Sequence, residues 1–371
     1  MKMDNNNLNI PDCSVSQVIE QLELLYGGAL RAKIPFQQMP AVFLWGPAGV
    51  GKSDAVRQFA QSLAASSGKT VKVTDVRLLL FSPVDLRGVP VADQNREFTN
   101  WLRPRLFDMD ASDGTVNILF LDELSAAPQS VQAAAYQITL DRRIGEHALP
   151  ENCIVIAAGN RTTDQSVSYK MPKALANRLM HYNVICEFSS WKEWAIRSGI
   201  DSRIVGYLSF DNSRLCVTPD SSDLAYPTPR SWSFVDSVLR AASGQPIDSA
   251  GIHRLISACV GKDVSIEFQA WCNVYKHLPK VEDIRRGSCS EYPKTQDALY
   301  ALSASLTEAV LTGDGAISLT ELDNICAYAS RFPPDFALAF FKDLNRSEAV
   351  RLKLMQCTSL QRWMTKNKRY L

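Results

Sequence analysis

Short apolar runs alternate with stretches of helical spacing along the first half of the chain, and this pattern predicts its main elements. Apolar residues three or four positions apart predict a helix over residues 15–26 that Gly27 and Gly28 end. The same spacing predicts a second helix over residues 52–65. Strands alternating with helices indicate an α/β fold with a central parallel sheet covered on both faces. Apolar runs predict buried strands over residues 41–45, 116–121 and 154–158, and two further strands are predicted over residues 70–76 and 183–188.

The second half of the chain follows a helical pattern. Pro, Ser and Asp are enriched over residues 212–229, which predicts a linker before a helix that begins near Arg230. Apolar residues at helical spacing then continue to the C-terminus. Residues 314–321 imitate the second half of a calcium-binding loop, but the first ligand positions of that loop lack carboxylates. A capping box of Ser318 with Glu321, which opens a helix, is the better interpretation.

The turn after the first strand has the sequence of a phosphate-binding loop. It reads glycine, four residues, then Gly-Lys-Ser, between a strand and a helix as such a loop requires. The glycines let backbone N–H groups converge on phosphate oxygens, and the N-terminus of the helix adds partial positive charge. Lys52 supplies a charge for the phosphates and Ser53 a hydroxyl for Mg²⁺, whereas a glycine turn with a stray lysine is the alternative. The predicted phosphate-binding residues are Gly46, Pro47, Ala48, Gly49, Val50, Gly51, Lys52 and Ser53.

A pair of acidic residues, Asp122 and Glu123, ends the buried run over residues 116–121. Asp122 suits a magnesium ion, either directly or through a water molecule, so it is predicted to bind the cofactor and, together with Ser53, the metal. Glu123 is placed to polarise a water molecule for attack on the γ-phosphate. The two acids together favour hydrolysis of ATP over storage of the nucleotide.

The residues that follow resemble those of the MoxR family of AAA+ ATPases. The resemblance is carried by residues 122–135, Asp-Glu-Leu-Ser-Ala-Ala-Pro-Gln-Ser-Val-Gln-Ala-Ala-Ala, and by residues 141–145, Asp-Arg-Arg-Ile-Gly. It implies a ring, usually of six subunits, with the nucleotide at a subunit interface. It also implies three regions: an AAA+ core, a linker with a helical lid, and a C-terminal helical region. Their expected bounds are 1–190, 191–280 and 281–371.

Three further polar residues gain roles from the resemblance. Asn160 matches the sensor-1 position that orients the attacking water, although Gly-Asn-Arg-Thr departs from the family's usual turn; a turn-forming asparagine is the alternative. Arg178, just before the fifth strand, matches the arginine finger that reaches the neighbouring subunit's γ-phosphate; an arginine that caps a helix is the alternative. Arg230 matches the sensor-2 arginine of the lid, against a purely structural arginine. The predicted catalytic residues are therefore Glu123, Asn160, Arg178 and Arg230.

Two segments are expected to be insertions. Residues 83–107 are rich in Pro, Gly and Arg, and propensity alone predicts a long loop there. The resemblance instead implies a hairpin inserted into the core, and a second hairpin over residues 142–150. Such insertions usually touch the substrate, whereas solvated surface charge is the alternative explanation of their arginines.

Composition and charge narrow the class of protein. The 371 residues are enough for two or three domains, and 40 basic against 39 acidic residues leave a net charge of +1. This balance favours neither nucleic acid nor a membrane surface. No apolar run has the length of a membrane span, and the N-terminal residues lack a signal-peptide core. Nine cysteines without zinc-ligand spacing predict reduced thiols and a cytoplasmic location.

The sequence thus predicts an ATP-hydrolysing ring of the MoxR type, with ATP and Mg²⁺ as cofactors, that remodels a protein client. The resemblance implies a partner protein with a von Willebrand A domain. A nucleic-acid-directed AAA+ motor of defence systems or mobile elements is the alternative, and the near-neutral charge disfavours it. A nucleotide-gated scaffold is a third possibility, which Glu123 disfavours.

Overall fold

The computed structural model divides the chain into two compact units, residues 1–187 and residues 188–371. We treat each unit by itself. The segment 312–316, which contains part of the calcium-loop imitation, lies outside the described residues. The residues that the structure describes are 9–161, 164, 169, 171–220, 222–311 and 317–370.

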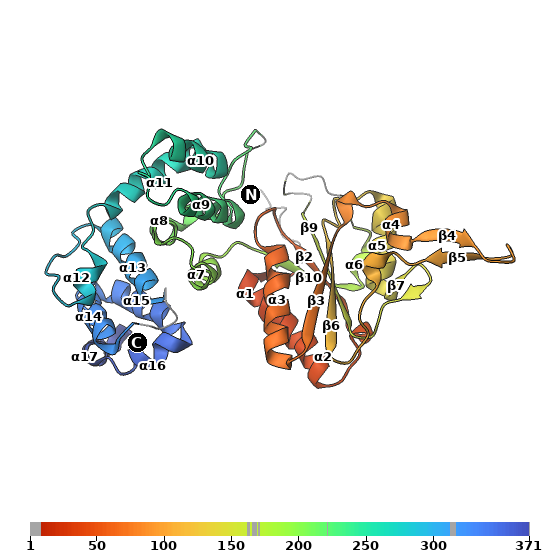
Figure 1. The fold of residues 1–371 in the computed structure, drawn as a ribbon, viewed down its shortest axis with the longest axis horizontal. Helices are drawn as coiled ribbons and strands as arrows, with labels where there is room; N and C mark the ends of the chain where they lie inside the picture. Colours follow the sequence, from red (N-terminus) through yellow and green to blue (C-terminus); the bar gives the residue numbers. More distant parts are fainter. Residues whose placement is uncertain are drawn as a thin grey trace. The chain divides into compact units, whose positions relative to one another are not determined.

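The first unit is built on a parallel sheet, as the alternating pattern predicts (Figure 1). Six described strands hydrogen-bond in the order β1-β10-β2-β9-β6-β3, and every neighbouring pair is parallel. Because the strands are parallel, the loops after β2, β6 and β9 all lie at the carboxyl edge of the sheet. The strands are β1 (Asp12–Cys13), β2 (Ala41–Trp45), β3 (Thr70–Arg77), β6 (Thr115–Asp122), β9 (Cys153–Gly159) and β10 (Leu179–Val184).

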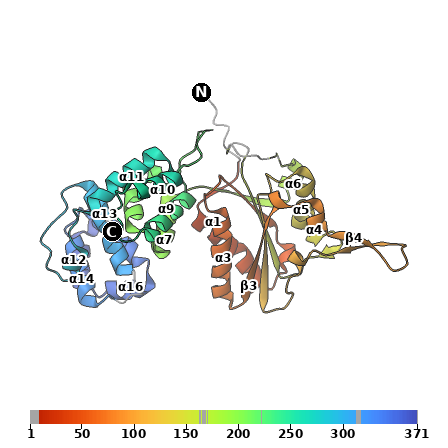
Figure 2. The ribbon, with the colours of Figure 1, turned by 45° about the horizontal axis from the view of Figure 1, so that its top comes forward.

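Helices cover both faces of this sheet (Figure 2). On one face, Val56, Phe59 and Leu63 of α3 pack into a buried cluster with α1 and the sheet. On the other face, Val131 and Ile138 of α5 belong to a second buried cluster. The helices of the first unit are α1 (Val15–Leu22), α2 (Gly28–Arg31), α3 (Lys52–Ser67), α4 (Pro83–Arg87), α5 (Gln129–Asp141) and α6 (Lys173–Ala176), with a π-helical turn at Glu23–Gly27 between α1 and α2.

Two predicted boundaries are wrong. The helical segment that begins at Val15 does not end at Gly27 but continues to Arg31. Glycine costs a helix only about 1 kcal/mol, and the full burial of Leu22 and Tyr26 outweighs that cost.

The fifth strand was predicted over residues 183–188 but spans Leu179–Val184, and Phe188 opens a helix instead. Polar residues within the strand hid it from the apolar pattern. His181 is hydrogen-bonded to Trp45, and Asn183 donates to Asp12. These partners, which lie far away in sequence, satisfy side chains that local propensity excludes from a buried strand.

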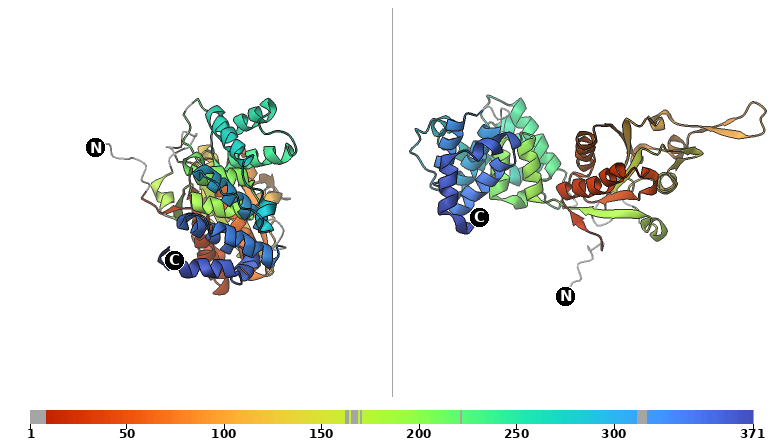
Figure 3. Two further views of the ribbon diagram at one scale, coloured as in Figure 1. Left: turned by 90° about the vertical axis from the view of Figure 1, so that its left-hand side faces the viewer. Right: turned by 90° about the horizontal axis from the view of Figure 1, so that it is seen from below.

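Both expected insertions contain hairpins. The long loop that propensity alone predicts over 83–107 is wrong, because the segment forms α4 and the antiparallel strands β4 (Val89–Ala92) and β5 (Thr99–Leu102). This hairpin projects away from the rest of its unit (Figure 3). The second hairpin pairs β7 (Arg143–Ile144) with β8 (His147–Ala148).

The second unit is helical in the part that the structure describes. Rings of Tyr207, Trp232 and Phe268 pack edge-on or tilted, with centroids 5.4–5.6 Å apart, around the start of the unit. No described helix combines the length and apolar character that crossing a membrane requires. The helices are α7 (Phe188–Arg197), α8 (Ser202–Phe210), α9 (Pro229–Ala241), α10 (Ala250–Val260), α11 (Lys262–Tyr275), α12 (Val281–Arg285), α13 (Gln296–Leu311), α14 (Leu319–Ala329), α15 (Pro334–Asn345), α16 (Glu348–Leu354) and α17 (Thr358–Lys366).

Capping boxes start two of these helices. The predicted pair of Ser318 and Glu321 opens α14: the Ser318 hydroxyl accepts from the Glu321 amide, and the Glu321 carboxylate accepts from the Ser318 amide at 3.0 Å. The expected helix near Arg230 is α9, which Thr228 caps with Ser231. Both boxes satisfy backbone N–H groups that have no partner within the helix.

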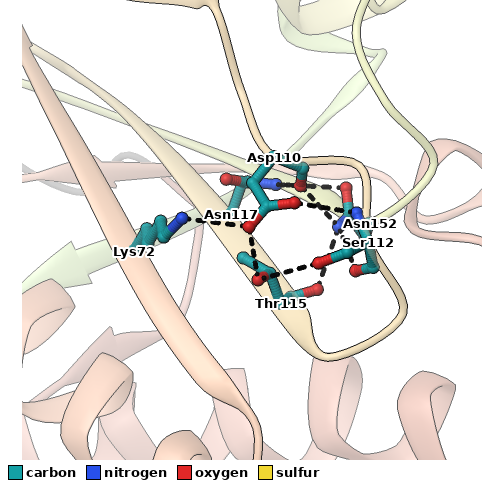
Figure 4. Close-up of polar contacts among 6 residues, drawn as sticks. All are labelled: Lys72, Asp110, Ser112, Thr115, Asn117 and Asn152. Carbon is teal, nitrogen blue, oxygen red and sulfur yellow. Dashed lines mark hydrogen bonds and ion pairs between the residues drawn. The ribbon is translucent and has the colours of Figure 1, made fainter.

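A polar clamp fixes the loop that enters β6, at the edge of the sheet opposite the phosphate-binding loop (Figure 4). The Asp110 carboxylate accepts hydrogen bonds from the Ser112 amide (3.0 Å), Lys72 Nζ (3.0 Å) and Thr115 Oγ1 (2.9 Å). The Asp110 carbonyl accepts from the side-chain amide of Asn117 at 2.7 Å. Hydrogen bonds from Ser112, Lys72 and Thr115 hold the pKa of Asp110 well below its ordinary value.

Asp110→Asn should therefore destabilise the protein at neutral pH. A carboxyl group whose folded pKa is lowered stabilises the fold fully above its unfolded pKa of about 3.9 and loses this effect as the pH falls through the folded value. Thermal unfolding between pH 7 and pH 3 should show a difference from the parent that narrows below about pH 4. Asp113→Asn is the control, because the Asp113 side chain bonds to no described residue. A difference that stays constant with pH would contradict this role of Asp110.

Candidate nucleotide site

The loop between β2 and α3 has the backbone shape of a phosphate cradle. Gly46, Gly49 and Gly51 have φ of 150°, 78° and 108°, which side chains other than glycine rarely adopt. A Cβ atom at Gly46 would lie 2.6 Å from the carbonyl oxygen of Val184. The loop therefore fits tightly against the neighbouring strand, and its amides lie at the N-terminus of α3, where the helix favours an anion.

Lys52 lies inside the site, and its ammonium group donates hydrogen bonds to oxygen atoms of the chain. Phosphate oxygens would compete with these atoms for the ammonium group. Its side chain is buried, and Nζ donates to the carbonyl oxygens of Gly46 (2.5 Å) and Pro47 (2.9 Å). It also donates to Asn160 Oδ1 at 2.9 Å. The predicted sensor asparagine and the predicted phosphate-binding lysine thus meet, although 108 positions separate them in the chain.

Ser53 and Asp122 also meet. Ser53 Oγ donates to Asp122 Oδ2 at 2.9 Å, and Asp122 Oδ1 accepts from the backbone amide of Glu123 at 2.9 Å. A hydroxyl and a carboxylate are oxygen donors of the kind that Mg²⁺ prefers, so this pair fits the ion. Burial, followed by the charge of Asp122, raises the pKa of Asp75 on the adjacent strand β3, and the charges of Arg77 and Arg57 oppose this shift.

Glu123 has a strained backbone. Its φ is +59°, in the left-handed region, which costs a residue other than glycine about 1–2 kcal/mol. The amide of Leu124 donates to Ala158 on β9, which fixes the turn directly after Glu123. This turn redirects the chain at the end of β6, and strain of this kind is concentrated at functional sites.

Ser125 is a residue of the site that the sequence reasoning missed. Its hydroxyl donates to the Asn160 carbonyl and accepts from the Asn160 amide, both at 2.9 Å. A Cβ atom at Gly159 would lie 2.6 Å from Ser125 Oγ, so glycine is required for this contact. The hydroxyl therefore fixes the backbone that carries Asn160. A serine three residues after Asp122 gives no signal alone, because its partner lies on another strand.

The two predicted arginines have no partner in this cluster. Arg178 occupies the exposed turn between α6 and β10, and Arg230 is exposed in the first turn of α9, which belongs to the second unit. Neither side chain bonds to any residue within the described part of the chain. The first unit therefore brings together Lys52, Ser53, Asp122, Glu123 and Asn160, and it leaves Arg178 outside this group.

Comparisons with known proteins find one family model and several similar proteins. Residues 41–181 match the family model described as ATPase family associated with various cellular activities (AAA). Chaperone MoxR1 of Mycobacterium tuberculosis is 27% identical over 143 residues, which are 38% of this chain and 34% of that protein. A RuvB mutant of Thermotoga maritima has a TM-score of 0.40 and 15% identity, covering 83% of this chain and 90% of its own. NtrX of Brucella abortus, solved with ATP, has a TM-score of 0.37 and 13% identity, covering 96% and 69%.

The phosphate cradle, the acidic pair after β6 and the family match define the class of protein. Residues 41–181 form a P-loop domain that matches the AAA family of ATPases. Within this class, the residues that follow Asp122 resemble those of the MoxR family, and the similarity to the chaperone MoxR1 agrees with that resemblance. The resemblance noted in the sequence is thereby confirmed.

Glu123→Gly should be more stable than Glu123→Ala. Both substitutions remove the carboxylate, but only glycine relieves the positive φ, so a difference of about 1 kcal/mol in the free energy of unfolding is expected. Chemical denaturation of the two variants measures it. The same pair at Gln61, which is exposed within α3, is the control and should show the opposite order. Equal stability of the Glu123 pair would mean that the turn is unstrained.

Proposed function

We propose that this chain hydrolyses ATP in a homo-oligomeric ring and uses the turnover to remodel a protein client. Two hydrogen bonds at the carboxyl edge of the sheet support the hydrolysis. One joins the phosphate-binding Lys52 to the sensor residue Asn160. The other joins Ser53 to Asp122. Groups for phosphate, metal and water thus converge without any further rearrangement of the backbone.

Each residue of this cluster has a chemical role in the proposal. Ser53 and Asp122 hold Mg²⁺, which neutralises phosphate charge when it is bound. Glu123 accepts the proton of the attacking water, and Asn160 orients that water. Lys52 exchanges its present carbonyl partners for phosphate oxygens, which are stronger acceptors for an ammonium group.

The register of the sheet supports a site shared between subunits. Leu179, which follows Arg178, pairs with Ala41 at the start of β2. The phosphate-binding loop follows Trp45, at the other end of β2. At about 3.3 Å per residue of strand, Arg178 therefore begins roughly 16 Å from the loop along the sheet. This is beyond the reach of an arginine side chain, so Arg178 is proposed to act on the nucleotide of a neighbouring subunit, in a ring of six.

Arg230 is proposed to act as the sensor arginine of the lid. Arg230 lies in the first turn of α9, directly after the capped linker, where it would couple the state of the nucleotide to the helical lid.

The MoxR likeness supports a partner with a von Willebrand A domain. A neighbouring reading frame that encodes such a domain would strengthen this part, and its absence would weaken it.

The hairpin of β4 and β5 supports a protein client. Phe98 in the tip is 71% exposed, and Val89 and Leu102 on its strands are 54% and 59% exposed. Apolar side chains grouped on a projecting element are typical of a surface that binds another protein. The edges of a two-stranded ribbon also leave backbone groups available to an extended chain. An unfolded segment of a client fits this surface.

Mixing two inactive variants tests the shared site. Arg178→Ala should bind ATP normally and lose up to about 10³-fold in turnover, because it removes the finger and leaves the cradle intact. Glu123→Gln should bind ATP and stop turnover. In a mixed ring, some interfaces combine the intact Glu123 of one subunit with the intact Arg178 of its neighbour. Turnover measured after mixing should therefore recover.

The matched control combines two substitutions that both affect the nucleotide-holding side of the subunit interface. Lys52→Ala and Glu123→Gln both damage the subunit that holds the nucleotide, so their mixture should stay inactive. Lys52→Ala mixed with Arg178→Ala should recover. Absence of recovery in every mixture, with a turnover per subunit that does not depend on protein concentration, would show that the site works within one chain.

Phe98→Ser should uncouple the client from the ATPase. Basal turnover should remain within about twofold of the parent, because the hairpin contributes nothing to the cradle. Stimulation of turnover by a chemically unfolded model protein should be lost, because the exposed ring supplies much of the apolar contact. Leu352→Ser on α16 removes an apolar residue that is 66% exposed and serves as the control, with stimulation retained. Equal stimulation of both variants would rule out the hairpin as the client surface.

A further inference from the structure

His181 connects the strand β2, which leads into the phosphate-binding loop, with the end of α6, which leads into the turn of Arg178. It lies on β10, and its Nδ1 accepts a hydrogen bond from Trp45 Nε1 at 3.1 Å. Its Nε2 lies 2.8 Å from the carbonyl oxygen of Ala176. An indole N–H can only donate and a carbonyl can only accept, so the imidazole carries its proton on Nε2 and uses both nitrogens.

The ring of His181 is held in place by the sheet. Phe43 and His181 are direct partners in the register of β2 and β10, and the rings of Phe43 and Trp45 pack with centroids 4.3 Å apart. A Cβ atom at Gly159 would lie 3.0 Å from the ring of Phe43, so this ring also packs closely against the strand that precedes Asn160. His181 therefore packs against the aromatic residues of β2, the strand that leads into the phosphate-binding loop.

The other partner of His181 lies next to the proposed arginine finger. Ala176 is the last residue of α6, and Arg178 follows two residues later in the exposed turn. Carbonyl groups in the last turn of a helix accept no hydrogen bond from within the helix. A side chain or a water molecule must therefore donate to them. The Nε2–H of His181 does so for Ala176 and thereby fixes where α6 ends.

We infer that His181 is a positioning residue for Arg178. By holding the end of α6, it fixes the position of the turn that carries Arg178 from α6 into β10. By accepting from Trp45, the last residue before the phosphate-binding loop, it ties that turn to the strand that carries the loop. This inference rests on the proposed action of Arg178 on a neighbouring subunit, and its test is designed so that the two can fail separately.

A pair of substitutions distinguishes the two hydrogen bonds of the imidazole. The amide nitrogen of glutamine matches the reach of Nε2, so His181→Gln keeps a donor for Ala176. The amide oxygen of asparagine matches Nδ1, so His181→Asn keeps an acceptor for Trp45 and loses Ala176. We expect His181→Gln to hydrolyse ATP within about threefold of the parent. His181→Asn should lose about tenfold in kcat, with KM for ATP changed less than twofold, because the finger and not the cradle is displaced. Equal losses in both variants would contradict the role of the Ala176 contact.

Mixing experiments then show on which side of the subunit interface His181 acts. His181→Asn mixed with Glu123→Gln should recover turnover, because the cradle of the first works with the intact finger of the second. His181→Asn mixed with Arg178→Ala should not recover, since both lesions affect the finger. The reverse pattern would show that His181 acts through Trp45 on its own cradle and would overturn the inference. No recovery with either partner would show a general loss of structure and would overturn it too.

The mixture of Arg178→Ala with Glu123→Gln serves as the reference. If that mixture recovers and the His181 mixtures do not follow the expected pattern, the shared site stands and the positioning role fails. If the reference mixture itself stays inactive at ring-forming concentrations, the shared site fails, and the positioning role that rests on it is overturned with it.

Discussion

Parallel pairing of β2, β9 and β6 is the constraint on which the site depends. Each of these strands ends in a residue or loop of the site, and parallel register brings all three ends to one edge. A register shift of one residue would reverse the faces of a strand and separate Ser53 from Asp122. The buried aliphatic and aromatic residues on both faces of the sheet therefore fix the chemistry as well as the fold.

Local patterns predicted the parts of the site that follow one another in the chain. The cradle from Gly46 to Ser53 and the acidic pair after β6 are contiguous, so their spacing carries the chemistry directly. The apolar runs of β2, β6 and β9 were equally clear, because strands that are covered on both faces have almost no polar positions. The prediction of both hairpins rested on the family resemblance, because propensity alone predicted a loop in place of the first hairpin.

The rest depended on contacts between distant residues. The boundaries of β10 were misplaced because His181 and Asn183 gain their partners only in the folded sheet. Ser125 was missed for the same reason, since nothing near it in the chain indicates a bond to Asn160. The positive φ of Glu123 is also invisible in the sequence, because glutamate is not a residue that favours this conformation. Polar groups that are satisfied at long range are therefore the features that a local pattern fails to show.

The hydrogen bonds of Lys52 have a consequence for how strongly this lysine retains an anion. The ammonium group already has three acceptors in the chain itself, so its charge is stabilised before any phosphate arrives. A phosphate group that binds Lys52 therefore gains only the difference between its own oxygens and these acceptors. Acceptors that the chain itself supplies thus weaken the hold of Lys52 on any anion in the cradle.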